Sequence, residues 1–211
     1  LTVQVPTEKT NVIQPIYLPK LPDESGAILN AIRNPVGTNG LRKLVKSTQK
    51  VAISICDITR PMPSATVLPV LLRELSHVPK NQITIIIAAG THRPNTPDEI
   101  DNIVGKEVSE NYLIINHDAF DYNQLQYIDT TNDNIPIWLN RSWVESDFRI
   151  TTGFVEPHFF AGFSGGPKMV APGLAGFDTT MKLHSAKLIG DAKASWGITE
   201  GNPIHHAIKH I

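Results

Sequence analysis

Two histidines, His92 and His158, stand in or directly after loops that are rich in glycine and proline. Histidine is the side chain whose unperturbed pKa lies nearest neutrality, so each ring could give and take a proton at physiological pH. An isolated loop histidine is more often a simple hydrogen-bonded residue. That description fits the histidines to which we assign no role: His77, His117, His205, His206 and His210. Proton transfer at His92 and His158 is the first chemistry that the sequence suggests.

The segment 156–176 is rich in glycine and carries Lys168, two positions after the pair Gly165 and Gly166. A packed core gains nothing from so many flexible positions unless backbone must approach a ligand closely. The Walker A pattern is not satisfied, because a proline separates the glycines from the lysine and a methionine follows it. A desolvated lysine can be a covalent attachment point, and loop amides at the glycines can bind an anion. We therefore interpret the segment as a site.

A third polar cluster contains Asp57, Thr59 and Arg60. The arginine could grip a carboxylate or a phosphate through two parallel hydrogen bonds. Alternatively, the aspartate and the arginine could form a local ion pair of little energetic value. By spacing alone, His184 is an ordinary residue of a helix that Asp178 caps.

Four apolar, β-branched runs are short enough to be buried strands. They span residues 51–55, 83–88, 112–116 and 148–152. Helical patterns lie between them: Ser64 can cap one helix, Thr96 begins a capping box with proline at the next position, and another helix follows Asn202. This alternation predicts an α/β fold with a parallel, Rossmann-like sheet flanked by helices.

The candidate residues follow the predicted strands. Asp57 to Arg60 come after the first run, 90–96 after the second, and 153–158 after the last. Ligands of parallel sheets gather at the carboxyl ends of the strands. The three segments should therefore converge on one edge of the sheet.

Composition excludes several classes of protein. The 211 residues include 19 basic and 20 acidic side chains and give a pI near 6.8, so we expect neither a nucleic-acid nor a membrane partner. Residues 1–9 lack the basic-then-apolar order of a signal peptide, and there is no apolar run of the ~18 residues that a membrane helix needs. A single cysteine, Cys56, excludes an internal disulfide and is consistent with a cytoplasmic location.

Four motifs together resemble the nickel-dependent lactate racemase family. They are Asp-Ile-Thr-Arg-Pro-Met-Pro at 57–63, Gly-Thr-His-Arg-Pro-Asn-Thr at 90–96, the glycine-rich segment 156–176, and Leu-His-Ser at 183–185. The family's order is kept, and the four motifs are far more specific together than any one alone. Family members are about twice this length. The resemblance therefore implies that residues 1–211 form the N-terminal cofactor-binding and catalytic domain of a two-domain protein, the C-terminal domain being absent from this chain.

The resemblance also implies a cofactor and a reaction. In the family, the lysine that matches Lys168 carries a nickel-pincer nucleotide through a thioamide, and the histidine that matches His184 completes the nickel coordination. Asp57, Arg60, Gly165 and Gly166 are expected to bind the cofactor. The reaction is racemisation of a small 2-hydroxy acid by hydride transfer, with His92 and His158 as proton carriers, and the protein's own C-terminal domain is expected to supply substrate contacts.

The chain departs from the family at Pro167, where some members carry a basic residue. That puts in doubt any phosphate contact made there, but not the role of Lys168. Two other classes of function stay open on the sequence alone. One is a metal-dependent hydrolase with histidines around a simple ion, and the other is a non-catalytic nucleotide- or phosphate-binding domain. No redox role is expected for Cys56, which ends a buried strand.

Overall fold

The computed structural model describes residues 2–14 and 16–211. Its centre is a four-stranded parallel sheet in the order β3-β2-β1-β6. The strands of this sheet are β1 (Val51–Cys56), β2 (Ile83–Ala88), β3 (Leu113–Asn116) and β6 (Phe148–Thr151). The predicted α/β class and parallel sheet are confirmed, and each predicted strand lies within one residue of its observed limits.

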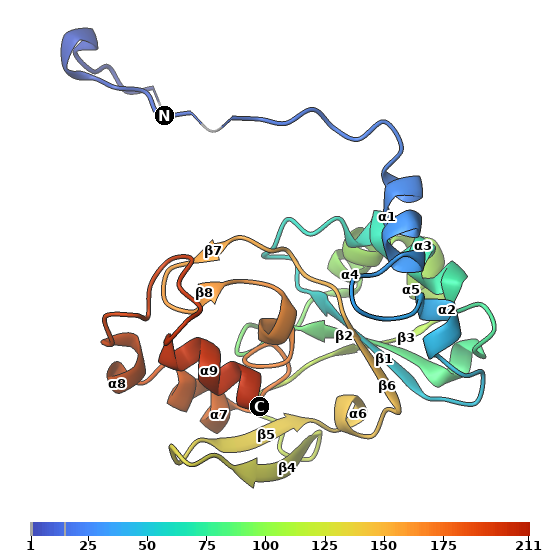
Figure 1. Ribbon diagram of the computed structural model, residues 1–211. Coiled ribbons are helices and arrows are strands. Elements are labelled where there is room, and N and C mark those ends of the chain that lie inside the picture. The colour runs from blue at the N-terminus through green and yellow to red at the C-terminus, as the bar shows by residue number, and fades with distance from the viewer. Residues whose placement is uncertain (1, 15) are drawn as a thin grey trace.

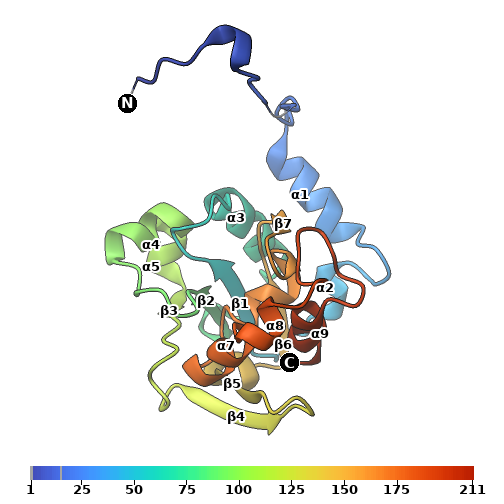
Figure 2. The ribbon, with the colours of Figure 1, turned by 90° about the vertical axis from the view of Figure 1, so that its left-hand side faces the viewer.

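Helices and two small antiparallel sheets surround the central sheet (Figures 1 and 2). The helices of the described residues are η1 (Thr7–Lys9), α1 (Glu24–Arg33), α2 (Leu41–Leu44), α3 (Ser64–Glu74), η2 (Lys80–Gln82), α4 (Pro97–Val104), α5 (Lys106–Asn111), α6 (Arg141–Val144), η3 (Gly166–Met169), α7 (Phe177–Leu183), α8 (Ala186–Ile189) and α9 (Pro203–His210). The small sheets pair β4 (Leu125–Thr130) with β5 (Pro136–Asn140) and β7 (Pro157–His158) with β8 (Gly162–Phe163).

The sheet has an apolar cluster on each face. Alternate residues of β1 point to opposite faces, so Val51, Ile53 and Ile55 join α3, α4 and α5 in the first cluster. Ala52 joins the second cluster, which is formed with β5, α7 and α9. Figure 1 shows these two groups of elements on opposite sides of the central strands. All six residues of β1 are buried, as expected of a central parallel strand.

Small side chains on the second face of β1 let the later chain approach closely. Ala52 and Ser54 are fully buried there. The Ser54 hydroxyl donates a hydrogen bond to the Met169 carbonyl at 2.8 Å, across 115 positions of sequence. This contact attaches the end of η3 to the sheet, and η3 carries Lys168.

Local capping signals are confirmed for two of the four predicted helix starts. Thr96 and Glu99 form the reciprocal capping box of α4, and the Asn202 side chain accepts from the first turn of α9. The prediction for Ser64 is wrong, because Pro63 takes the capping position and Ser64 is already the first helical residue. Among the described residues, the buried Ser64 hydroxyl has no hydrogen-bond partner.

The first 50 residues contain two helices that the sequence analysis did not identify, α1 and α2. The Asp23 side chain caps α1, and Arg33 at its end pairs with buried Glu74 of α3 at 2.8 Å. Residues 2–14 and 16–22 run away from the sheet as an exposed arm (Figure 1). No helix in the described part of the chain has both the length and the apolar character to cross a membrane.

Candidate active site

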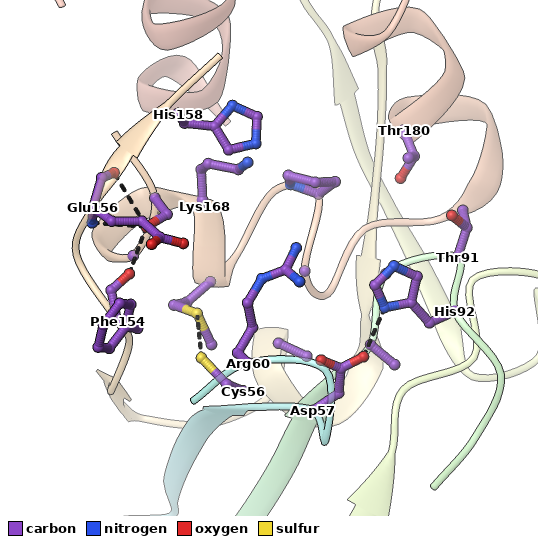
Figure 3. A pocket seen from close by; sticks show the side chains of 18 of the residues that line it. Cys56, Asp57, Arg60, Thr91, His92, Phe154, Glu156, His158, Lys168 and Thr180 are labelled. Carbon is purple, nitrogen blue, oxygen red and sulfur yellow. Dashed lines mark hydrogen bonds and ion pairs between the residues drawn. The ribbon is translucent and has the colours of Figure 1, made fainter. Parts of the chain in front are cut away.

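A cavity of about 580 Å³ opens at the carboxyl edge of the sheet (Figure 3). Its walls come from the loops after β1 and β2, from the chain between β6 and α8, and from the turn after α8. The predicted convergence of the three segments is therefore observed. The predicted site residues that line the cavity are Asp57, Arg60, His92, His158, Gly165, Lys168 and His184. Gly166 is not in the lining; it begins η3 instead.

Asp57 and His92 form a pair that the sequence analysis did not name. The Nδ1 atom of His92 lies 2.7 Å from Oδ2 of Asp57. Asp57 is only 5% exposed. The other carboxylate oxygen accepts from the backbone N–H and the hydroxyl of Thr59, at 3.2 and 2.7 Å. A carboxylate held this way fixes the orientation of an imidazole and stabilises its protonated form. The hydrogen bonds of the Asp57 carboxylate are thus to His92 and Thr59 rather than to Arg60.

His158 ends the short strand β7 and is held by its neighbours. Its Nδ1 atom accepts the backbone N–H groups of Phe160 and Ala161, at 3.4 and 3.2 Å. The ring stacks on Phe159 with 4.6 Å between ring centroids and meets Phe160 edge-on at 4.5 Å. Burial, assisted by the positive charge of Lys168, lowers the pKa of His158 to about 4. The ring is therefore neutral near pH 7.

Lys168 projects into the cavity from η3, whose path is set by glycines. Gly165 has φ +68° and Gly166 has φ +51°, a region that side chains with a Cβ rarely adopt. The ammonium nitrogen lies 5.7 Å from the centre of the Phe160 ring. Burial and then the charge of Arg60 lower the pKa of Lys168 to about 8. More of this amine is unprotonated at neutral pH than of an ordinary lysine, which makes it a better nucleophile.

His184 follows the last residue of α7, and its ring is oriented by the helix. Its Nδ1 atom lies 2.7 Å from the Thr180 carbonyl, so Nδ1 donates and Nε2 is left with a free lone pair. The edge of Phe160 contacts this ring as well, with 5.2 Å between centroids. The predicted Asp178 cap is wrong: Gly176 occupies the capping position, and Asp178 accepts from the Tyr122 hydroxyl at 2.8 Å.

Arg60 supplies a positive charge that is available to a ligand. In Figure 3 its guanidinium lies between Lys168 and His92. Its hydrogen bonds go to the carbonyl and hydroxyl of Thr59, at 3.4 and 3.1 Å. No carboxylate within the described residues forms an ion pair with it. The lining thus combines a free arginine, a half-buried lysine and three imidazoles, which suits an anionic ligand.

Several lining residues were not singled out from the sequence. Phe160 is a buried wall residue that touches both His158 and His184. Trp196 is 62% exposed and lies at the rim of the cavity, where its ring centroid is 6.1 Å from that of Phe159. Nothing in its local sequence points to the cavity, because it comes from a turn after α8. Thr180 could have been found from its position one helical turn before His184.

The described residues offer few metal donors at this cavity. No group of three or more histidine, cysteine, aspartate or glutamate side chains in residues 2–14 and 16–211 is arranged to hold a metal ion. His184 can offer one nitrogen. The buried thiol of Cys56 lies 3.7 Å from the Met169 sulfur, and burial raises the pKa of that thiol.

The comparisons with known proteins agree with this architecture. Residues 1–197 match the family model of the lactate racemase N-terminal domain. The lactate racemases of Thermoanaerobacterium thermosaccharolyticum and Lactiplantibacillus plantarum are 36% and 37% identical to the chain over 183 residues. In each case the match covers 86% of this chain and 43% of the relative. The chain therefore spans less than half the length of these curated relatives.

Two solved structures share the fold. The lactate racemase apoprotein from Thermoanaerobacterium thermosaccharolyticum superposes with a TM-score of 0.85 at 35% identity, covering 89% of this chain and 45% of that one. A Thermotoga maritima protein of known crystal structure superposes with a TM-score of 0.74 at 26% identity, covering 92% and 48%. The resemblance inferred from the four motifs is confirmed. The chain belongs to the lactate racemase N-terminal domain family.

Proposed function

We propose that this chain is the N-terminal, catalytic half of a racemase or epimerase that acts on a small 2-hydroxy acid such as lactate. The observation that carries the proposal is the convergence of His92, His158, Lys168 and His184 on one cavity. Two proton-carrying rings at one cavity suit an enzyme that must process both enantiomers of a hydroxyl-bearing carbon. The names of the relatives support the same activity.

The lining fits the nickel-pincer nucleotide that the family resemblance implies. The half-buried amine of Lys168 is suited to a covalent link, and the free lone pair of His184 is suited to nickel when soft sulfur donors complete the coordination. The absence of a protein metal cluster among the described residues agrees with a metal held chiefly by a cofactor. When bound, the group would supply the hydride acceptor, and the protein would supply geometry.

The chain's own residues would handle the substrate's proton and charge. His92, held by Asp57, accepts the hydroxyl proton at Nε2, and Arg60 binds the carboxylate of the substrate or the phosphate of the cofactor. Phe159 and Phe160 limit access of water to His158. We further propose that a C-terminal domain of the same protein completes the substrate contacts, and that the protein acts in the cytoplasm.

The first test is the mass of the Lys168 peptide, together with the nickel content. The protein would be produced at full length with the enzymes that build the cofactor. We expect a covalent adduct on Lys168, stoichiometric nickel, and racemisation of a 2-hydroxy acid. K168A should lose the adduct and the activity, and H184A should bind less nickel, whereas H210A, at an exposed position on α9, serves as the matched control.

An unmodified lysine without nickel, in a preparation where a known racemase of this family does become loaded, would refute the proposal. Binding of phosphate esters by such a protein would favour the nucleotide-binding alternative. Simple metal ions removable by a chelator, with Lys168 unmodified, would favour the hydrolase.

A further inference from the structure

The exposed arm, residues 2–14 and 16–22, carries many large apolar side chains that nothing covers. Each of them is at least 57% exposed, and Ile16 reaches 94%. They are Val3, Val5, Val12, Ile13, Ile16, Tyr17, Leu18 and Leu21. Single exposed apolar residues are normal on a protein surface, but so many within one short segment indicate a surface that a partner covers.

The backbone of the arm is as open as its side chains. Within the described residues, the hydrogen bonds of the arm lie only between Pro6 and Thr10, where η1 makes a turn. The stretches on either side, 2–5 and 11–14, thus have N–H and C=O groups to offer to another chain segment. Val3 and Val5 are two positions apart, the spacing that places side chains on one face of a strand. Such a segment is suited to add to the edge of a sheet.

Prolines lower the entropic cost of ordering the arm. The segment has prolines at positions 6, 15, 19 and 22. The ring of proline fixes φ, so the free chain has fewer conformations to lose when the arm docks. An apolar, proline-rich segment is therefore better prepared for binding than a flexible linker of glycine and serine.

The base of the arm is fixed to the rest of the molecule. The Asp23 side chain caps α1, Ile32 packs against the first apolar cluster, and Arg33 pairs with Glu74 at 2.8 Å. Figures 1 and 2 show the arm leaving α1 and extending past the end of the molecule near β7. Because β7 lines the cavity, a domain that covers the cavity would be within reach of the arm, which can span up to about 60–70 Å when extended.

We propose that the arm is a strap that docks on the C-terminal half of the same protein. Residues 2–14 add to a sheet edge of that half, with Val3 and Val5 facing its core, and the apolar side chains of 16–22 pack beside it. The match to the curated relatives covers only 43% of their length, so a protein of that size has ample further surface to cover the arm. Both partners belong to one polypeptide, which gives them an effective concentration on the order of millimolar and favours this docking over a second copy. The inference rests on the C-terminal domain of the proposed function, but not on racemisation.

Paired variants of the full-length protein test the strap. V3D/V5D puts two charges on the apolar face, and T2D/Q4D puts the same charges on the alternate positions. All four residues are exposed in residues 2–14 as described, so without a docking partner the two variants would behave alike. We expect amide hydrogen exchange in the arm, and thermolysin cleavage near Val12 and Ile13, to become about tenfold faster or more in V3D/V5D, with little change in T2D/Q4D.

A lysine-directed cross-linker locates the partner in the wild-type protein. In the monomer, Lys9 or Lys20 of the arm should be joined to lysines beyond residue 211. Cross-links only to lysines within 24–211 would overturn the proposal. It would also fail if exchange and cleavage were equal in the wild type and both variants.

Dilution separates the two possible sources of protection. If the arm loses its protection on dilution together with a dimer seen by light scattering, the partner is a second copy and the proposal is wrong. A protected arm in a full-length protein that carries the cofactor and racemises nothing would refute the proposed function and leave the strap in place.

Discussion

At the scale of single residues, the chemistry of the cavity depends on the hydrogen-bond partner that holds each functional side chain. His92 and Asp57 are 35 positions apart, and their 2.7 Å contact exists only because the loops after β1 and β2 meet. The sequence predicted both residues for the site but gave Asp57 a role in cofactor binding, which stays a prediction. Local sequence patterns do not predict a contact between residues so far apart in the sequence. The pairing could therefore be recognised only from the three-dimensional structure.

Replacing the carboxylate tests the pairing directly. D57N keeps the size of the side chain but removes the charge that orients and stabilises protonated His92, so kcat/KM should fall by about 10²–10⁴. T59V removes one hydrogen bond to the carboxylate and should cost only about tenfold at most. The measurement is racemisation by the loaded, full-length enzyme, with circular dichroism to check the fold. Activity of D57N at the wild-type level would show that the pair has no catalytic part.

The amine of Lys168 should titrate at an unusually low pH. In the unmodified chain, its reaction with an amine-directed reagent should reach half its maximal rate near pH 8, because burial and Arg60 disfavour the charged form. R60Q removes the positive neighbour and should move this midpoint upward, whereas R42Q, on α2, should not move it. Peptide mass spectrometry over a pH series gives the rate at Lys168. A midpoint near the ordinary lysine value of about 10.4 would contradict the expectation.

At the scale of elements, the sequence predicts best where the cause of structure is local. Buried β-branched runs identified the strands of the central sheet, and Thr96 and Asn202 identified two helix starts. The caps assigned to Ser64 and Asp178 were wrong, because the preceding Pro63 and Gly176 took the capping positions. The β4–β5 hairpin and α1 were not predicted, since tertiary packing against the two apolar clusters decides them.

The β7–β8 hairpin, which presents His158, should depend on one glycine. Gly162 has φ +81°, and a Cβ there would overlap the Ile198 carbonyl oxygen. Gly37 has a similar φ of +76° but open space around it, so G37A should cost only the conformational penalty of about 1–2 kcal/mol. We expect G162A to cost at least ~2 kcal/mol more in urea unfolding. Equal losses of stability in the two variants would show that the hairpin can move away from the Ile198 loop.

At the scale of the whole molecule, a buried histidine joins three parts of the chain. His117 follows β3, is 1% exposed, and donates from Nε2 to the Ala175 carbonyl at 3.0 Å. Its Nδ1 accepts from the Asn140 amide at 3.4 Å. The ring thus connects the end of the central sheet to the β4–β5 hairpin and to the glycine-rich segment 156–176. Its neutral form is required by both partners.

This connection should make the fold sensitive to acid. Burial lowers the pKa of His117 below its ordinary value of about 6.5. At mildly acidic pH the unfolded chain therefore binds a proton at His117 more readily than the native state does. Its contribution to stability is complete above the unfolded pKa and is lost as the pH falls below about 6.5. The free energy of unfolding of H117Q, measured in urea at several pH values, should therefore depend less on pH than that of the wild type. H210Q, at an exposed position, should keep the wild-type slope, and an unchanged slope in H117Q would refute the argument.

The hydrogen bond from Ser54 to the Met169 carbonyl has a consequence for synthesis on the ribosome. It spans 115 positions, and translation at 5–20 residues per second leaves an interval on the order of ten seconds between the two partners. During that interval one face of β1 is incompletely covered, because η3, α7 and α9 have not yet been made. A nascent chain with an open apolar face is a substrate for chaperones. Lys168, which we propose carries the cofactor, thus reaches its position only after this face of the sheet has been exposed during synthesis. The yield of protein that can bind the cofactor should therefore depend on chaperone capacity during expression.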